Sequence, residues 1–212
     1  MMNRKKLTAV VASVALVAVL GIGGTLMYFT DRDTKSNVIT MGNVNGSLIE
    51  TTDTENAVNT EDGITYNDRV TPGDTLSKVP TVKLGDDSED AYIRVKMTIT
   101  GLDMVDAQGN KYADILENQL DIGNKWTKNV DGYYYYADKM SKKGETQALF
   151  TEVKVPEGWG NEVANAEVTI DLIAELIQAD NFDSHLQKNG NNVIGWTGIT
   201  EDDIEDYTVP QP

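Results

Sequence analysis

The sequence predicts an all-β protein, a single antiparallel β-sandwich with one or two short helices in its connections. Three observations carry this prediction. Ala91–Thr100 alternates strictly between apolar and polar residues, Trp126–Ala137 reads as a β-hairpin, and turn residues separate about seven or eight short strand-like stretches. We find no internal repeat and no linker inside residues 38–180, so we expect one domain.

The stretch 91–100 is the clearest strand. Its apolar residues Ile93, Val95, Met97 and Ile99 fall on one face, and the intervening residues fall on the other. That alternation predicts a half-buried strand with one face in water.

The hairpin at 126–137 is predicted from its turn. Asp131-Gly132 supplies the positive φ angles of a tight turn, and four tyrosines, Tyr133 to Tyr136, follow it. Alternation sends Tyr133 and Tyr135 to one face and Tyr134 and Tyr136 to the other. With Trp126 these rings could form a sugar-binding strip, but burial in the sheet is favoured.

The remaining elements carry weaker signals. Residues 76–84 form a strand that Pro80 assigns to an edge or a bulge, and residues 147–155 form another. Residues 112–122 have helical spacing. Residues 166–179 contain good helix formers but alternate, so strand is favoured. Two further stretches, 38–50 and 63–70, are fainter strand candidates.

Composition excludes several functional classes. The 212 residues carry 34 acidic and 18 basic side chains, a net charge of −16, which argues against nucleic acid as a partner. The absence of cysteine excludes a disulfide framework and a cysteine nucleophile. A single histidine, His185, excludes a zinc site built from several histidines. We therefore expect no enzymatic activity and no catalytic residue.

The first 27 residues have the three parts of a secretory signal peptide. MMNRKK is a positive start, Leu7–Leu20 is apolar, and Gly21, Gly23 and Gly24 interrupt the helix before the chain turns polar. The alternative is a retained membrane anchor, because Leu7–Phe29 is long enough to span a bilayer. Cleavage between Met27 and Tyr28 is favoured.

This division gives four segments. They are a signal peptide (1–27), an N-terminal leader or donor strand (28–37), the β-sandwich (38–188) and an acidic C-terminal tail (189–212).

The junction Gly23-Gly24-Thr25-Leu26-Met27-Tyr28-Phe29-Thr30-Asp31 resembles the GGT-x-A-x-F-x-D junction of the TasA/camelysin family. Members of that family are processed by a dedicated SipW-type signal peptidase, so the resemblance implies such a peptidase as a partner of this chain during export. Blocks such as Thr71-Pro72-Gly73-Asp74, Asp131–Tyr136 and Pro156–Trp159 resemble clostridial exported proteins of the same type. Met27 departs from the family pattern, which has a small residue there. The resemblance implies a jelly-roll-like sandwich.

Two groups of residues are candidate metal sites, one for calcium and one for zinc. Asp86, Asp87, Glu89 and Asp90 crowd into one turn, and hard oxygen ligands in a flexible loop suit calcium. A solvated acidic turn is the favoured interpretation, since EF-hand spacing is lacking. A second acidic run lies at 201–206. Camelysin-type proteolysis would need zinc, for which His185 with Asp180 and Asp183 is a poor donor set, and no H-E-x-x-H is present.

The predicted new N-terminus carries the functional prediction. Tyr28-Phe29-Thr30-Asp31 begins a polar, extended segment with two aromatic residues at a free end. Such a segment can complete the sheet of a neighbouring subunit, and head-to-tail addition makes filaments.

We therefore expect a secreted cell-surface or biofilm-matrix protein that polymerises with itself into fibres, without a required cofactor. The membrane is contacted only through the signal peptide before cleavage. The alternatives are a camelysin-like secreted metalloprotease and a monomeric surface adhesin or spore-coat-associated protein.

Overall fold

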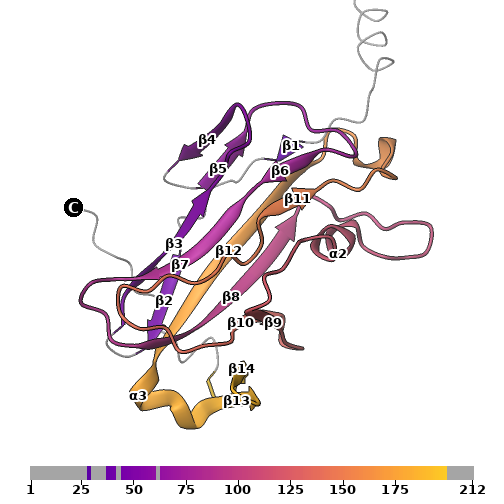
Figure 1. The fold of residues 1–212 in the computed structure, drawn as a ribbon. Coiled ribbons are helices and arrows are strands. Elements are labelled where there is room, and N and C mark those ends of the chain that lie inside the picture. The colour runs from indigo at the N-terminus through magenta and orange to yellow at the C-terminus, as the bar shows by residue number, and fades with distance from the viewer. Residues whose placement is uncertain (1–27, 30–36, 42–43, 61–62, 200–212) are drawn as a thin grey trace, which may run out of the picture.

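β12 (Glu167–Gln178), a strand of twelve residues, organises the larger sheet of the sandwich. The computed structural model describes residues 28–29, 37–41, 44–60 and 63–199. One side of β12 pairs antiparallel with β8 (Ala91–Thr100) over ten residues. Next to β8 lie β10 (Tyr133–Tyr136) and then β9 (Trp126–Lys128), both antiparallel. Figure 1 shows β12 and β8 side by side along the length of the molecule.

The other side of β12 pairs with two short strands from the N-terminal segment. β1 (Tyr28–Phe29) and β2 (Asn37–Met41) both run parallel to β12. The sandwich is antiparallel as predicted except at this edge. A strand's own residue pattern does not specify the direction of its partner, so the sequence carried no sign of the parallel pairing.

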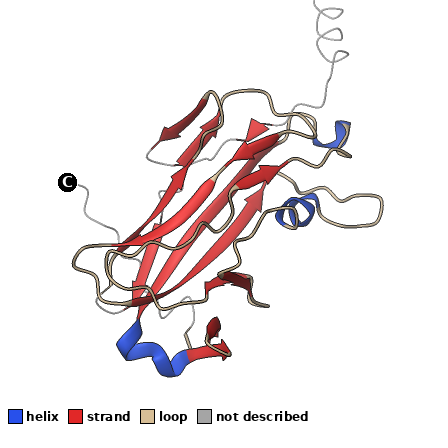
Figure 2. Ribbon diagram, in the orientation of Figure 1, coloured by secondary structure: helices blue, strands red, loops and turns tan. Residues whose placement is uncertain are grey.

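The second layer consists of shorter strand pairs. β3 (Gly46–Thr51) pairs with β7 (Val79–Leu84), and β6 (Thr75–Ser77) pairs with β11 (Glu152–Lys154), all antiparallel. β4 (Ala57–Thr60) and β5 (Gly63–Tyr66) form a separate hairpin. Figure 2 shows the sandwich to be dominated by strands, with helices only in connections and at one end.

Helical structure is short, as predicted. α2 (Tyr112–Glu117) buries Tyr112 and Leu116, which lie one turn apart on the same face. The 3₁₀ turn η1 (Asn161–Val163) precedes β12, and α3 (Ala179–Phe182) and η2 (Asp183–His185) follow it. The hairpin β13 (Leu186–Asn189) and β14 (Asn192–Trp196) completes the described chain.

The main core lies between the two layers. The inward-facing residues Leu172, Ala174 and Leu176 of β12 are each at most 3% exposed. They share one apolar cluster with Leu48 and Val82 of the second layer. Alternation therefore supplies the sandwich with its inner surface, as the sequence predicted for 91–100 and 166–179.

The tyrosines of β10 divide between two clusters as predicted. Tyr134 and Tyr136 join the main core, while Tyr133 and Tyr135 join a second cluster on the opposite face of the sheet. All four rings are buried, which confirms the interpretation of the tyrosines as sheet residues.

The sequence predicted that the outer face of β8 lies in water, and this is wrong for the first half of the strand. Tyr92 is 6% and Arg94 is 3% exposed. They are covered by residues 179–199, which we call the C-terminal cap; it comprises α3, η2, β13 and β14. In Figure 1 the cap lies at the end of the sheet where β12 ends.

The predicted start of the tail and the predicted edge position of the strand at Pro80 are also wrong. The cap crosses residue 189, where the acidic tail was expected to begin, and its hairpin is ordered with Gly190 at φ 61° in the turn. Pro80 does not place its strand at an edge, because β7 lies between β3 and residues 145–149. The Pro80 carbonyl accepts a hydrogen bond from Leu149 N at 2.9 Å.

Candidate functional site

The edge of β12 that receives the N-terminal strands is the candidate functional site. Tyr28 and Phe29 pair with Glu167 and Val168, and residues 37–41 pair with residues 173–177. Both strands come from the segment that follows the predicted cleavage bond. The described residues thus place that segment on one edge of the larger sheet.

Gly101 permits the tight junction at the start of this edge. It has φ +83°, and an added Cβ would lie 1.8 Å from the Glu167 carbonyl oxygen. β8 therefore ends against the first residue of β12, the same residue that pairs with Tyr28. A side chain at position 101 would push the two backbones apart.

The predicted assembly residues divide between described and undescribed parts of the chain. Tyr28 and Phe29 lie on a sheet edge, which is the kind of position the donor-strand prediction requires, but the edge belongs to the same chain. Thr30, Asp31 and the predicted cleavage residue Met27 lie outside the described residues. Pairing with another subunit stays a prediction.

Three of the four calcium candidates are held by nitrogen donors from other parts of the chain. Asp90 lies 3.0 Å from Lys139 Nζ and Asp86 lies 3.3 Å from Lys143 Nζ. The side chain of Asn45 donates to Asp87 at 2.6 Å and holds the pKa of that carboxyl below its usual value. The hydrogen bond from Lys139 likewise lowers the pKa of Asp90.

Glu89, the fourth candidate, accepts a hydrogen bond from Ser88 Oγ at its backbone carbonyl. Within the described parts of the chain, no three or more His, Cys, Asp and Glu side chains are grouped as metal ligands. The turn at 85–90 is thus an ion-paired junction with residues 139–143, and calcium binding there stays untested. The acidic run at 201–206 lies outside the described residues.

The zinc candidates are also engaged elsewhere. His185 Nδ1 lies 2.9 Å from the Thr197 carbonyl oxygen. Asp183 accepts hydrogen bonds from the Tyr92 hydroxyl at 2.8 Å and from Lys188 at 3.1 Å, and these contacts lower the pKa of Asp183. His185 and Asp183 of the predicted set therefore make contacts that stabilise the C-terminal cap and join it to β8.

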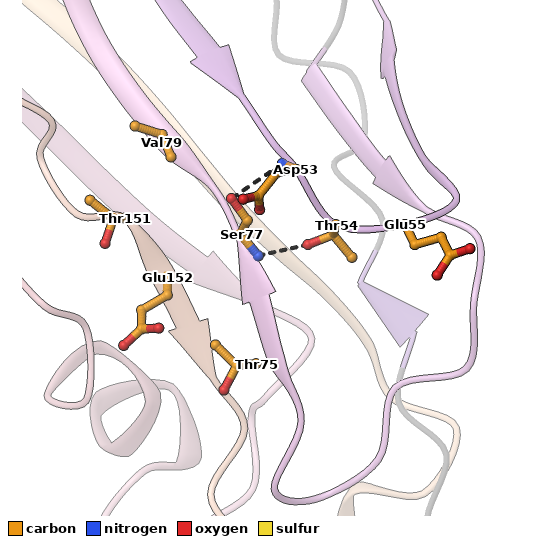
Figure 3. A pocket seen from close by; sticks show the side chains of 8 residues that line it. All are labelled: Asp53, Thr54, Glu55, Thr75, Ser77, Val79, Thr151 and Glu152. Carbon is orange, nitrogen blue, oxygen red and sulfur yellow. Dashed lines mark hydrogen bonds between the residues drawn. The ribbon is translucent and has the colours of Figure 1, made fainter.

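A surface pocket that the sequence did not indicate lies between β6, β11 and the residues after β3. Figure 3 shows its lining: Asp53, Thr54, Glu55, Thr75, Ser77, Val79, Thr151 and Glu152. Ser77 N donates to Thr54 Oγ1 at 2.7 Å and Asp53 N donates to Ser77 Oγ at 3.3 Å, so hydroxyl groups tie the wall together. Glu152 is paired with Lys154. The pocket offers hydroxyls and carboxylates to a polar ligand, without a buried charge to select one.

Among the described residues no helix is both long and apolar enough to cross a bilayer. No protein-family model, no curated protein and no solved structure matches the chain.

Proposed function

We propose that this chain is an exported structural protein that polymerises by exchanging its N-terminal strands along the edge of β12. The observation that carries the proposal is the position of β1 and β2: the segment freed by the predicted cleavage supplies edge strands and not central ones. An edge strand is bound to the sheet along one side only. A neighbouring chain can therefore supply the same strand with the same hydrogen bonds.

The strength of the pairing suits exchange. The β2 register covers five residues and the β1 register two. Each backbone hydrogen bond contributes about 0.5–1.5 kcal/mol, and association opposes the sum by several kcal/mol. Exchange should therefore depend on protein concentration. Fibres of such subunits would suit a cell-surface layer or a biofilm matrix, as the TasA/camelysin resemblance implies.

The pairing within one chain favours a second candidate, a monomeric surface adhesin. If each chain fills its own β12 edge permanently, the protein has no free acceptor and stays a monomer. The two candidates differ in whether the N-terminal strands leave their own sheet.

A strand-complementation experiment tests whether the edge accepts a strand in trans. A form beginning at Val44 lacks β1 and β2 and keeps Val44, which is 7% exposed in the core. We expect a peptide of residues 28–43 to bind this form and raise its melting temperature. If the Val44 form is unfolded alone, the peptide should restore its folding.

The control peptide carries Ile39→Pro and Thr40→Pro. Proline lacks the backbone N–H, and of two consecutive residues in a strand one directs its N–H toward the partner. The control peptide should bind far more weakly. Equal binding of the two peptides, or no binding of either, would remove the support for strand exchange.

Export is tested separately by N-terminal sequencing of secreted material. The signal-peptide prediction expects a start within about two residues of Tyr28. Recovery of the intact chain from Met1 in a membrane fraction alone would favour the anchor.

A further inference from the structure

The C-terminal cap packs on the sheet through a second apolar cluster. Tyr92, Tyr133, Tyr135 and Ile177 of the sheet meet Ala179, Val193, Trp196 and Ile199 of the cap in a cluster separate from the main core. The cap is internally connected by the β13–β14 ladder and by Thr197 N donating to the His185 carbonyl at 2.6 Å. It is therefore a structural unit at the end of the sheet where β12 ends (Figure 1), and it packs on the outer face through this cluster.

A charged pair lies beneath the cap. Arg94 and Glu175 are each 3% exposed, and Arg94 Nε donates to Glu175 Oε2 at 2.6 Å. The Tyr133 hydroxyl donates to Glu175 Oε1 at 2.9 Å, and Arg94 Nη1 donates to the Tyr135 hydroxyl at 3.2 Å. All of these partners belong to the sheet.

Trp196 is the cap residue that covers this pair. The Arg94 guanidinium carbon lies 4.4 Å from the centre of the Trp196 ring and, in a separate contact, 3.9 Å from that of Tyr133. Trp196 also meets Tyr135 edge-on at 5.7 Å. Its indole Nε1 is buried without a hydrogen-bond partner among the described residues.

Closing the cap therefore gains less free energy than covering an apolar surface of equal area. Taking a charged pair out of water carries a desolvation penalty that the attraction between the charges only partly offsets. A buried N–H without a partner adds a further penalty. Opening the cap would return both groups to water while leaving the main core intact.

Within the described residues, isolated hydrogen bonds and not a strand ladder join the cap to the sandwich. Ala179 N donates to the Asp90 carbonyl at 2.8 Å and Val193 N to the Ala137 carbonyl at 2.9 Å. Asn129 Nδ2 donates to the Ile194 carbonyl at 2.9 Å, and the Tyr92 hydroxyl to Asp183. By contrast the β8–β12 ladder pairs ten residues.

We propose that residues 179–199 form a lid that opens as one unit, with Trp196 on Arg94 as its latch, while the sandwich stays folded. The open form presents the Arg94–Glu175 pair flanked by the hydroxyls of Tyr133 and Tyr135. Proteins open in such cooperative units when a segment is held by fewer and weaker contacts than the core.

Hydrogen exchange on the chain beginning at Tyr28 tests the lid. The amides of Ala179 and Val193 report on the cap, and the amides of the β8–β12 ladder report on the sandwich. We expect the cap amides to be at least about tenfold less protected than the ladder amides. Equal protection of the two sets would overturn the proposal.

Three variants test the latch. Trp196→Ala should lower the protection of the cap amides by about tenfold and leave the ladder unchanged, since it removes the contact with Arg94. Trp196→Phe keeps an aromatic ring and removes the unpaired N–H, so cap protection should fall by less than in Trp196→Ala. The control Trp159→Phe, where Trp159 packs against Tyr112, should leave the ratio of cap to ladder protection unchanged.

Two results would contradict the latch. One is a parallel loss of protection in the cap and the ladder of Trp196→Ala, which would make the cap part of the global fold. The other is a loss in Trp196→Phe as large as in Trp196→Ala, which would assign the contribution of Trp196 to its N–H.

Discussion

At the scale of single residues, two ion pairs illustrate how burial changes what a charge does. Arg94 and Glu175 are enclosed by aromatic rings. Lys125 Nζ lies 2.7 Å from Asp138 Oδ2, and these two side chains are 39% and 48% exposed to water. When one partner of a buried pair is removed, the other charge stays in surroundings that solvate it poorly. Loss of one exposed partner leaves the other in water.

We predict that Glu175→Gln destabilises the closed form of the protein by up to about 3–5 kcal/mol, because Arg94 is then buried without a counter-charge. Opening of the cap returns Arg94 to water, so the free energy of that opening limits the cost. The matched variant Asp138→Asn should cost about 0–1 kcal/mol. Urea unfolding of both variants measures the difference. Equal effects would mean that the Arg94 site is open to water in solution.

The buried tyrosines predict a loss of stability at high pH. Burial raises the pKa of Tyr92 and of Tyr135 to about 12, and burial raises that of Tyr134 as well. Between pH 10 and 12 the unfolded chain ionises these phenols while the folded chain keeps them protonated. The folded state thus binds more protons, and its stability falls as pH rises through this window.

Thermal unfolding from pH 9 to pH 12 measures this effect. Tyr92→Phe removes one ionisable phenol and should make the decline shallower than in the unmodified chain. A melting temperature that stays constant from pH 9 to pH 12 would contradict the raised pKa values.

At the scale of elements, the junction between β8 and β12 determines where the larger sheet begins. Gly101 and Gly109 have nearly the same backbone conformation, at φ +83° and +85°. They differ in their surroundings, because a Cβ at Gly101 would meet the Glu167 backbone while one at Gly109 would meet nothing within 4 Å.

We predict that Gly109→Ala costs about 1–2 kcal/mol, the price of a left-handed conformation with a side chain. Gly101→Ala should cost about 1–3 kcal/mol more, because it also forces the two strands apart. Urea unfolding of the two variants measures their free energies of unfolding, and the difference between them reports the close approach of β8 to β12. Equal costs would show that β8 and β12 separate readily at this end.

Local patterning was sufficient to predict three strands, with alternation indicating β8 and β12 and the Asp131-Gly132 turn indicating β10. It did not predict what covers the opposite face. Tyr92 and Arg94 look like water-facing residues in the sequence, but both are buried beneath the cap. Tyr92 contacts Asp183, and Arg94 contacts Trp196, about a hundred positions away. The cap hairpin itself had a usable signal in Gly190-Asn191, the two residues between β13 and β14, which favour a tight turn.

The candidate sites were less predictable for the same reason. The sequence marks the acidic turn at 85–90 as a turn, but its lysine partners come from residues 139–143. It marks Tyr28 and Phe29 as unusual for a free end without indicating a parallel partner in β12. Pairing over long separations depends on the whole fold and leaves no local pattern.

At the scale of the whole molecule, net charge opposes assembly. The chain carries −16 at neutral pH, and subunits in a fibre bring like charges together. Salt screens this repulsion, and partial protonation of carboxylates at pH 4–5 reduces it.

We therefore predict that the mature chain assembles more readily at high salt and at pH 4–5 than at neutral pH and low salt. Several carboxyls, including those of Asp121 and Asp183, have pKa values lowered by hydrogen bonds, and their stabilising contribution is lost only as pH falls below about 4. Light scattering across salt and pH measures assembly. Assembly that weakens with added salt would contradict the charge argument.

The most direct test of the central claim is electron microscopy, with sedimentation, of two forms of the chain. A form beginning at Tyr28 keeps β1 and β2, while a form beginning at Val44 lacks both. A start at Val38 would remove β1 and leave most of β2, so it separates the two strands less cleanly. Strand exchange predicts filaments from the Tyr28 form and none from the Val44 form under the same conditions. Filaments from both forms, or from neither, would contradict it.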